Sequence, residues 1–320
     1  MGQTQVASSK AEAFRWGCEL EVFLAQDVIQ RHGISIGSYH HGHPLPAPFP
    51  QGWTAERDGS LHTDRRGYVG VEIVSPILKG RAGIEQVKQV AQILREMGAS
   101  VNHTAAVHLH LSPESVVGPS SSEIAEFVAK LLYQTAQHET ALYASTGTHR
   151  RENGQYARSI KRQKQDADRI RKATTPARKR EELSWVVSQN ARYHSLNLTN
   201  LFTSKATVEW RVFASTTSWQ KLVGHICTCL ALAERATETT RMDWEAVASE
   251  KTYQVKGRGL RELNRLFYLT GWTLGRRDVG QAEVGLAGWI APIEDLNPVK
   301  AALRKLARKY SREEQDGGVA

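Results

Sequence analysis

Polar and apolar residues alternate along four short runs of the chain, which is the pattern of β-strands with one buried face. Three of these runs place two reactive side chains two residues apart, with an apolar residue between them. They read Glu19-Leu20-Glu21, His108-Leu109-His110 and Glu209-Trp210-Arg211, and the fourth run, 70–76, carries Glu72. Because residues i and i+2 of a strand share a face, each pair points to one side of a sheet. If the four strands are neighbours, these side chains converge on one polar surface, and the apolar residues pack against helices behind it.

Other runs predict the helices and the remaining strands. Residues 53–61 end in the turn signal Asp58-Gly59-Ser60 before the Glu72 strand, so the two segments are expected to form a hairpin. A second hairpin is expected from 191–198 and 207–213, whereas the proline-rich residues 39–50 indicate a loop. Apolar residues recur at helical spacing in 84–94, 124–135, 222–236, 260–274 and 299–310.

The composition is that of an ordinary globular domain. The 320 residues are 40% apolar and 23% charged, and no clear linker divides them. We therefore interpret residues 1–312 as a single domain with a helical C-terminal part at 220–312, followed by a frayed tail at 313–320. No stretch approaches the roughly 20 apolar residues of a membrane span, and the N-terminal segment lacks the apolar core of a signal peptide. These observations lead us to expect a cytoplasmic protein with no membrane partner.

Positive charge is concentrated in the basic segment, residues 150–180. This segment has 12 basic and 3 acidic residues, an excess equal to the net charge of +9 of the whole chain. Such a segment can bind nucleic acid, form a solvated helix face, or line a phosphate site. Aromatic residues that would stack on bases are nearly absent, since Tyr156 stands alone there. We expect a solvated or partly disordered basic helix over 161–180 and a phosphate-binding wall over 150–158.

The reactive pairs indicate a divalent cation. Glutamates that converge in a folded core repel one another unless a cation lies between them. Carboxylates with an imidazole suit Mg²⁺ or Mn²⁺ better than zinc, and Mg²⁺ commonly bridges nucleotide phosphates beside an arginine. The chain contains neither a P-loop nor a dinucleotide-binding glycine motif after a strand. A bound nucleotide would therefore lie on the sheet surface, held by metals and arginines.

These motifs resemble, in order, those of the amidoligases, a family within the superfamily of glutamine synthetase and glutamate-cysteine ligase. The resemblance covers about residues 14–220, and its specificity lies in the ordered set rather than in any single motif. The motifs that carry it are Gly17-Cys18-Glu19-Leu20-Glu21, Asp58-Gly59-Ser60, the run 70–76, His108-Leu109-His110, Arg151-Glu152-Asn153-Gly154-Gln155-Tyr156, Tyr193 with Asn197, and Glu209-Trp210-Arg211. The resemblance implies an α+β fold with a mainly antiparallel sheet, a concave catalytic face and helices on the other face.

The resemblance also implies residue roles and an activity. It implies ATP and Mg²⁺ (or Mn²⁺) as cofactors and the ligation of an amino-acid or peptide carboxylate to an amine through an acyl phosphate. The implied metal ligands are Glu19, Glu21, Glu72, His108 and Glu209; the implied nucleotide contacts are His110, Arg211 and Arg150; and the implied substrate contacts are Arg151, Tyr156, Tyr193 and Asn197. Structural hydrogen bonding in a hairpin is an equally good interpretation of Tyr193 and Asn197.

The catalytic roles fall to Arg211, Arg151 and Asp58. The two arginines would stabilise charge on the transferring phosphoryl group, and Asp58 would take the proton of the amine. Two other classes of protein remain open. A metal-dependent phosphate-ester hydrolase would use the same ligands to activate water, and a nucleic-acid-binding protein would depend on the basic segment.

Overall fold

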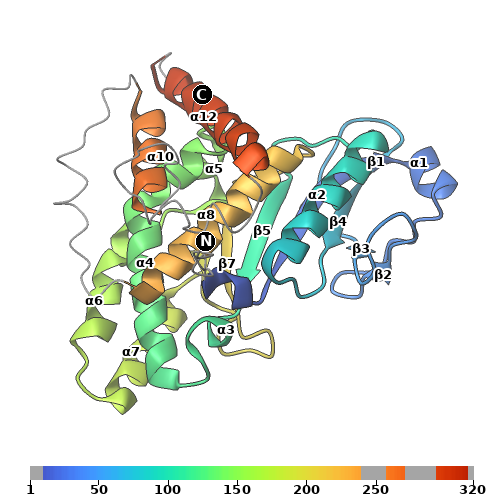
Figure 1. The fold of residues 1–320 in the computed structure, drawn as a ribbon. Helices are drawn as coiled ribbons and strands as arrows, with labels where there is room; N and C mark the ends of the chain where they lie inside the picture. Colours follow the sequence, from blue (N-terminus) through green and yellow to red (C-terminus); the bar gives the residue numbers. More distant parts are fainter. Residues whose placement is uncertain (1–9, 239–256, 271–292, 316–320) are drawn as a thin grey trace, which may run out of the picture.

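The computed structural model describes residues 10–238, 257–270 and 293–315, and its centre is one antiparallel sheet of seven strands (Figure 1). The strand order across the sheet is β2-β3-β4-β1-β5-β7-β6, and every neighbouring pair is antiparallel. The strands are β1 (Trp16–Ala25), β2 (His43–Pro44), β3 (Thr54–Glu56), β4 (Tyr68–Val74), β5 (Ala106–Leu111), β6 (Leu196–Asn197) and β7 (Val208–Ala214). The four strands that carry the reactive pairs and Glu72 are therefore neighbours, as the alternation predicts.

Both expected hairpins are present. β3 pairs with β4, and the two-residue strand β6 pairs with β7. The proline-rich segment is mostly a loop, although His43 and Pro44 form the edge strand β2 beside β3. Proline is tolerated at that place because an edge strand leaves one row of N–H groups unpaired.

Helices cover the face of the sheet opposite the reactive pairs. Leu20, Leu109 and Trp210 are at most 1% exposed on this side. The covering helices are α2 (Gly80–Glu96), α4 (Ser121–Ala144) and α8 (Trp219–Glu238); α8 contacts β5 and α2, and α4 contacts β7 and α8. The helices expected from 84–94, 124–135 and 222–236 are thus confirmed, and so is the α+β class.

Two more helices pack on this layer near the C-terminus. α10 (Arg258–Leu269) and α12 (Ile293–Gln315) contact α4 and each other (Figure 1). Residues 271–274 of the helix expected over 260–274 lie outside the described residues. The expected fraying after Arg312 is wrong for residues 313–315, which continue α12, and the remaining tail lies outside the described residues. Among the described residues, no helix is both long enough and apolar enough to span a membrane.

The basic segment folds into short helices rather than into one. α5 (Arg150–Asn153) is followed by α6 (Lys164–Lys172) and α7 (Pro176–Gln189), and α6 and α7 both pack on α4. The single helix expected over 161–180 is wrong because residues 173–175 are extended, and Pro176 begins a new helix with Thr175 as its N-cap. Two short α-helices, α1 (Gln26–Arg31) and α3 (Glu114–Val117), and turns of 3₁₀ helix at Lys10–Ala13, Gln155–Ala157 and Lys161–Gln163 complete the described helices.

Candidate active site

The register of the strands arranges the reactive side chains in rows across the sheet. Glu19 on β1 lies opposite His108 on β5, and His110 lies opposite Glu209 on β7. Glu209 lies opposite Asn197 on β6. A further row consists of carboxylates alone, because Glu21 lies opposite Glu72, and Glu72 lies opposite Glu56 on β3. Residues that are far apart in the sequence therefore share one face.

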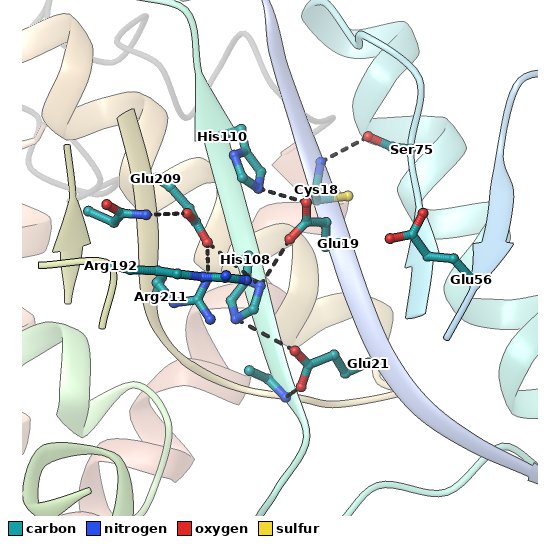
Figure 2. Close-up of polar contacts among 12 residues, drawn as sticks. Cys18, Glu19, Glu21, Glu56, Ser75, His108, His110, Arg192, Glu209 and Arg211 are labelled. Carbon is teal, nitrogen blue, oxygen red and sulfur yellow. Dashed lines mark hydrogen bonds and ion pairs between the residues drawn. The ribbon is translucent and has the colours of Figure 1, made fainter. Parts of the chain in front are cut away.

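His108 lies at the centre of this face, between three carboxylates (Figure 2). Its Nδ1 is 3.0 Å from Oε2 of Glu19 and 3.7 Å from Oε1 of Glu209, and its Nε2 is 3.7 Å from Oε1 of Glu21. His110 adds a second imidazole, with Nε2 3.1 Å from Oε1 of Glu19. All of these distances are short enough for a cation to be shared among the groups.

Glu209 is held by two neighbours. Its Oε2 accepts a hydrogen bond of 2.7 Å from Nδ2 of Asn197, and its Oε1 accepts one from Arg211 (Figure 2). Oδ1 of Asn197 in turn accepts hydrogen bonds from the backbone N–H and the hydroxyl of Thr199. In this structure the Asn197 side chain orients Glu209, which is the structural role considered above for this residue.

The protonation states divide the site into two parts. Burial, together with the carboxylates of Glu19, Glu21, Asp58 and Glu56, raises the pKa of Glu72 to about 10. Burial likewise raises the pKa of Glu21. Burial also disfavours the charged form of Glu19 and of Glu209, but the imidazoles of His110 and His108 outweigh it and lower both pKa values. Every group that shifts the pKa of Glu72 is a carboxylate, whereas imidazoles lie close to Glu19 and Glu209.

The carboxylates around Glu72 fit a divalent cation. Glu72 is 4% exposed and accepts no hydrogen bond from any described residue. Three sets of ligand atoms lie within 4.8 Å of one another: Glu19 with Glu72 and His108, Glu21 with Asp58 and Glu72, and Glu19 with His110 and Glu209. Carboxylate oxygens with one imidazole are ligands that Mg²⁺ and Mn²⁺ accept. Asp58, which we expected to be a general base, thus lies at ligand distance from Glu21 and Glu72.

A pocket opens above the cluster and is basic on its other side. Its cavity volume is about 170 Å³. Arg211 lies in its wall as expected, together with two cations that the sequence did not single out, Arg192 and Lys205. The wall residues are Glu19, Tyr39, His40, Asp58, Glu72, His108, His110, Arg192, Asn197, Thr199, Asn200, Lys205, Glu209 and Arg211. We call this hollow the reaction pocket.

Sequence reasoning also missed Glu56. It follows no paired motif and lies in a strand of three residues, yet it is 6% exposed and in register with Glu72. Arg192 and Lys205 lie in loops, where no periodicity points to a shared face. None of the three residues could be found without the order of the strands.

Of the expected substrate residues, Asn197 lines the reaction pocket, and the other three lie beside it. Arg150, Arg151 and Tyr156 line a second hollow, together with Ser60 and His62. The ring of Tyr193 meets that of Tyr156 edge to face, with centroids 5.3 Å apart. The expected nucleotide contact Arg150 therefore faces this second hollow, apart from Glu19, His108 and Glu209.

Arg151 lies between the two hollows. It is 7% exposed, and its Nη2 donates a hydrogen bond of 2.5 Å to the carbonyl oxygen of Arg211. Its Nε is buried and has no hydrogen-bond partner among the described residues. Burial, with the charge of Arg211 nearby, lowers the pKa of Arg151 to about 10, so the guanidinium stays charged at neutral pH. A buried cation with a free donor is suited to an anionic ligand.

Comparison with known proteins identifies a family. The sequence matches the family described as "Putative amidoligase enzyme" over residues 10–233. No curated protein matches it. Among solved structures, the fold is similar to that of a bifunctional glutathione synthetase from Pasteurella multocida, with 12% sequence identity and a TM-score of 0.45. That match covers 96% of this chain and 50% of the synthetase, so the chain spans half of that protein's length.

A second similar structure is a GmaS–ADP complex, which is 12% identical in sequence and has a TM-score of 0.39. The match covers 96% of this chain and 71% of the GmaS chain. GmaS without ligand is 13% identical with a TM-score of 0.37, and the match covers 97% and 72% of the two chains. The family assignment rests on the sequence match.

Proposed function

The chain belongs to the amidoligase family, and from this premise we propose that it is an ATP- and Mg²⁺-dependent ligase. In the proposed reaction it joins a carboxylate to an amine through an acyl phosphate. The substrates are an amino acid or a peptide on the carboxylate side and a small amine or peptide amine on the other.

One observation carries this proposal. The reaction pocket has carboxylates and imidazoles on β4, β1 and β5, and it has three cations, Arg192, Lys205 and Arg211, at its β7 and β6 side. The acidic side suits a divalent cation, and the basic side suits the phosphates that such a cation bridges. An enzyme that only activated water would need no separate hollow for a second organic substrate, whereas a ligase needs one.

The residues would divide the work as follows. Mg²⁺ held by Glu19, Glu21, Glu72, His108 and Glu209, with Mn²⁺ as a substitute, would supply Lewis-acid polarisation of phosphoryl oxygens. Arg211, fixed by Glu209, would stabilise charge on the transferring group. His110 and Arg192 would contact the other phosphate oxygens. Arg151 would orient the substrate carboxylate at the boundary between the two hollows.

The bonds change in two steps. An oxygen of the substrate carboxylate attacks the terminal phosphorus of ATP, the bond to the bridging oxygen breaks, and ADP leaves. The amine nitrogen then attacks the acyl carbon, the bond from carbon to the phosphate oxygen breaks, and inorganic phosphate leaves. Asp58 would take the proton that the amine loses. The second hollow, with Tyr156, Tyr193 and Arg150 at its edge, would hold the body of the substrate.

An isotope experiment tests the reaction type. A carboxylate substrate labelled with oxygen-18 should give inorganic phosphate with one labelled oxygen, because the attacking oxygen leaves with phosphorus. Hydroxylamine can replace the unknown amine and trap the activated carboxylate as a hydroxamate, so candidate amino acids and peptides can be screened one at a time. Steady ATP or phosphoester hydrolysis without any hydroxamate would instead identify a metal-dependent hydrolase.

The basic segment gives less support to nucleic-acid binding. Several of its cations form ion pairs. Nζ of Lys179 lies 2.8 Å from Oε2 of Glu126, and Nε of Arg169 lies 3.0 Å from Oε2 of Glu182. Nη1 of Arg171 lies 3.0 Å from Oδ1 of Asp168. Paired cations release fewer counterions from a nucleic acid than free ones do, which lowers the affinity. We therefore place nucleic-acid binding second.

A further inference from the structure

A loop contributes to the wall of the reaction pocket. We call residues 37–42 the strap; it lies between α1 and β2 and carries Tyr39 and His40 in the pocket wall. A backbone hydrogen bond of 2.9 Å from His41 N–H to the Ser38 carbonyl oxygen closes the strap into a tight turn. Its tip is therefore a compact unit of four residues, 38–41.

The strap is attached at opposite sides of the sheet. On the β3 side, the backbone N–H of His40 donates a hydrogen bond of 3.1 Å to Oε1 of Glu56. On the β6 side, Nη2 of Arg192 donates a hydrogen bond to the hydroxyl of Tyr39. The strands β4, β1, β5 and β7 lie between these attachments in the sheet. Tyr39 and Arg192 share the pocket wall with the side chains of these strands, Glu72, Glu19, His108 and Glu209.

The base of the strap is rigid. Gly37 exchanges backbone hydrogen bonds with Ala55 (3.0 Å) and Arg57 (3.1 Å). A Cβ on Gly37 would lie 1.9 Å from the His41 carbonyl oxygen, and one on Gly42 would lie 2.6 Å from Oγ1 of Thr54. His40 at the tip has a φ of 61°, in the left-handed region that non-glycine residues rarely adopt. These contacts restrict the base of the strap more than its tip.

The attachment at Arg192 is weak. Both side chains are exposed, Tyr39 by 42%, and the acceptor is a neutral phenol. Loss of an exposed contact of this kind changes the equilibrium between attached and detached side chains by about twofold to fivefold. A phosphate group is a stronger acceptor for a guanidinium, because it is charged and binds both arms of the fork. Arg192 also lies within electrostatic range of Glu209, and Figure 2 shows its side chain reaching toward Arg211 and His108.

We infer that Tyr39 and Arg192 form a gate over the reaction pocket, in which a bound phosphate takes Arg192 from Tyr39 and releases the tip of the strap. Arg192 is then a phosphate-binding residue, and Tyr39 competes with phosphate for it. The inference deepens the proposed function and rests on it for the identity of the ligand. The reaction-pocket arginines thus differ in kind: Arg211 is fixed by Glu209, and Arg192 changes partners.

The binding test uses the non-hydrolysable ATP analogue AMPPNP with Mg²⁺ and is read by titration calorimetry. Tyr39→Phe keeps the ring and removes the competing acceptor, so the dissociation constant should fall about twofold to fivefold. Arg192→Gln should raise it at least about tenfold. In the double variant, Tyr39→Phe should add nothing to Arg192→Gln, because the residue it frees is gone. Adenosine, which has no phosphate, should bind wild type and Tyr39→Phe equally.

Tyr133→Phe on α4 and Arg171→Gln on α6 are matched controls away from the pocket. Weaker AMPPNP binding by Tyr39→Phe, or an equal effect of Tyr39→Phe with and without Arg192, would overturn the gate.

A second measurement tests the gate without a nucleotide. Amide hydrogen exchange of the peptide that spans 38–43 should rise to the same extent in Tyr39→Phe and in Arg192→Gln, and the control variants should match wild type. Unchanged exchange in the two gate variants would overturn the inference. If wild type binds no AMPPNP but exchange rises in both variants, the proposed function and the exchange of partners by phosphate both fail, and only the attachment of the strap by Arg192 stands.

Discussion

The carboxylate of Glu209 and the side-chain amide of Asn197 face each other across β7 and β6, joined by a hydrogen bond of 2.7 Å from Nδ2 to Oε2. Both side chains are at most 2% exposed. Since Arg211 binds the other oxygen of Glu209, rotation of this carboxylate is blocked on both sides. Fixed carboxylates are what a metal site requires of its ligands, because the geometry is then set before the ion arrives.

Replacing Glu209 with Gln should abolish Mg²⁺-dependent ATP turnover, by at least about a hundredfold, and leave the fold intact. The shape of the side chain is retained and its charge is lost. Turnover is checked by phosphate release and the fold by circular dichroism. Glu21→Gln should behave alike, and the exposed Glu181→Gln on α7 is the control. Retained turnover in Glu209→Gln would remove Glu209 from the site. Glu56 would not serve as a control, because it lies opposite Glu72 and accepts a hydrogen bond from the strap residue His40.

Glu139 on α4 should be a main source of stability near the site. Its carboxylate accepts hydrogen bonds from the Ser159 hydroxyl (2.5 Å), the Ser195 hydroxyl (2.5 Å) and the Ile160 N–H (2.9 Å). Glu139→Leu leaves the buried Ser195 hydroxyl and Ile160 N–H without an acceptor, whereas the exposed Ser159 can bond to water. The loss should lower the free energy of unfolding by about 3 kcal/mol. Glu139→Gln keeps an acceptor for the backbone donor and should lose clearly less. Urea unfolding measures both, and equal losses would contradict the hydrogen-bonding account.

We expect the free energy of unfolding to fall at acidic pH, in part because of His225. Its ring stacks on Phe213 with centroids 4.3 Å apart, and its Nε2 is 3.1 Å from the Ser145 carbonyl oxygen. Burial, together with the charge of Lys221, lowers the pKa of this histidine from 6.5 to about 4. His225 therefore binds a proton more tightly in the unfolded state than in the folded state. The contribution of the neutral ring to the free energy of unfolding is complete above pH 6.5 and is lost as the pH falls through about 4.

The loss is at most about 3 kcal/mol. His225→Gln has no titrating ring and should show a smaller difference in unfolding free energy between pH 7.5 and pH 5 than wild type. An unchanged difference would show that His225 does not carry this pH dependence.

The basic segment should separate into a functional and a structural part. Neutralising Arg178, Lys179 and Arg180 together should leave ATP turnover within about threefold, because Arg178 and Lys179 pair with Glu182 and Glu126 on neighbouring helical surface. Arg151→Gln should reduce turnover strongly, since this buried guanidinium supports Arg211. Steady-state kinetics of both variants provide the test. Equal damage from both changes would make the segment one functional unit.

The sequence by itself determined which side chains share a face within each strand. Glu19 and Glu21 project together, with Leu20 opposite, because successive side chains of any strand alternate. The same local rule located the buried face of α2, α4 and α8, since helical spacing depends only on neighbouring residues. The ordered motifs also pointed to the family, and the match over residues 10–233 confirms it.

Only the tertiary structure decided which strands are neighbours and in which register. The position of His108 opposite Glu19, and of Glu56 beside Glu72, follows from pairings between segments separated by tens of residues, whose choice depends on packing of the whole core. Arg192 and Lys205 enter the reaction pocket from loops, where no periodic signal exists. The division of the basic segment at Pro176, and the placement of Arg150 in the second hollow rather than beside the metal ligands, likewise depend on how α5, α6 and α7 pack against the rest of the fold.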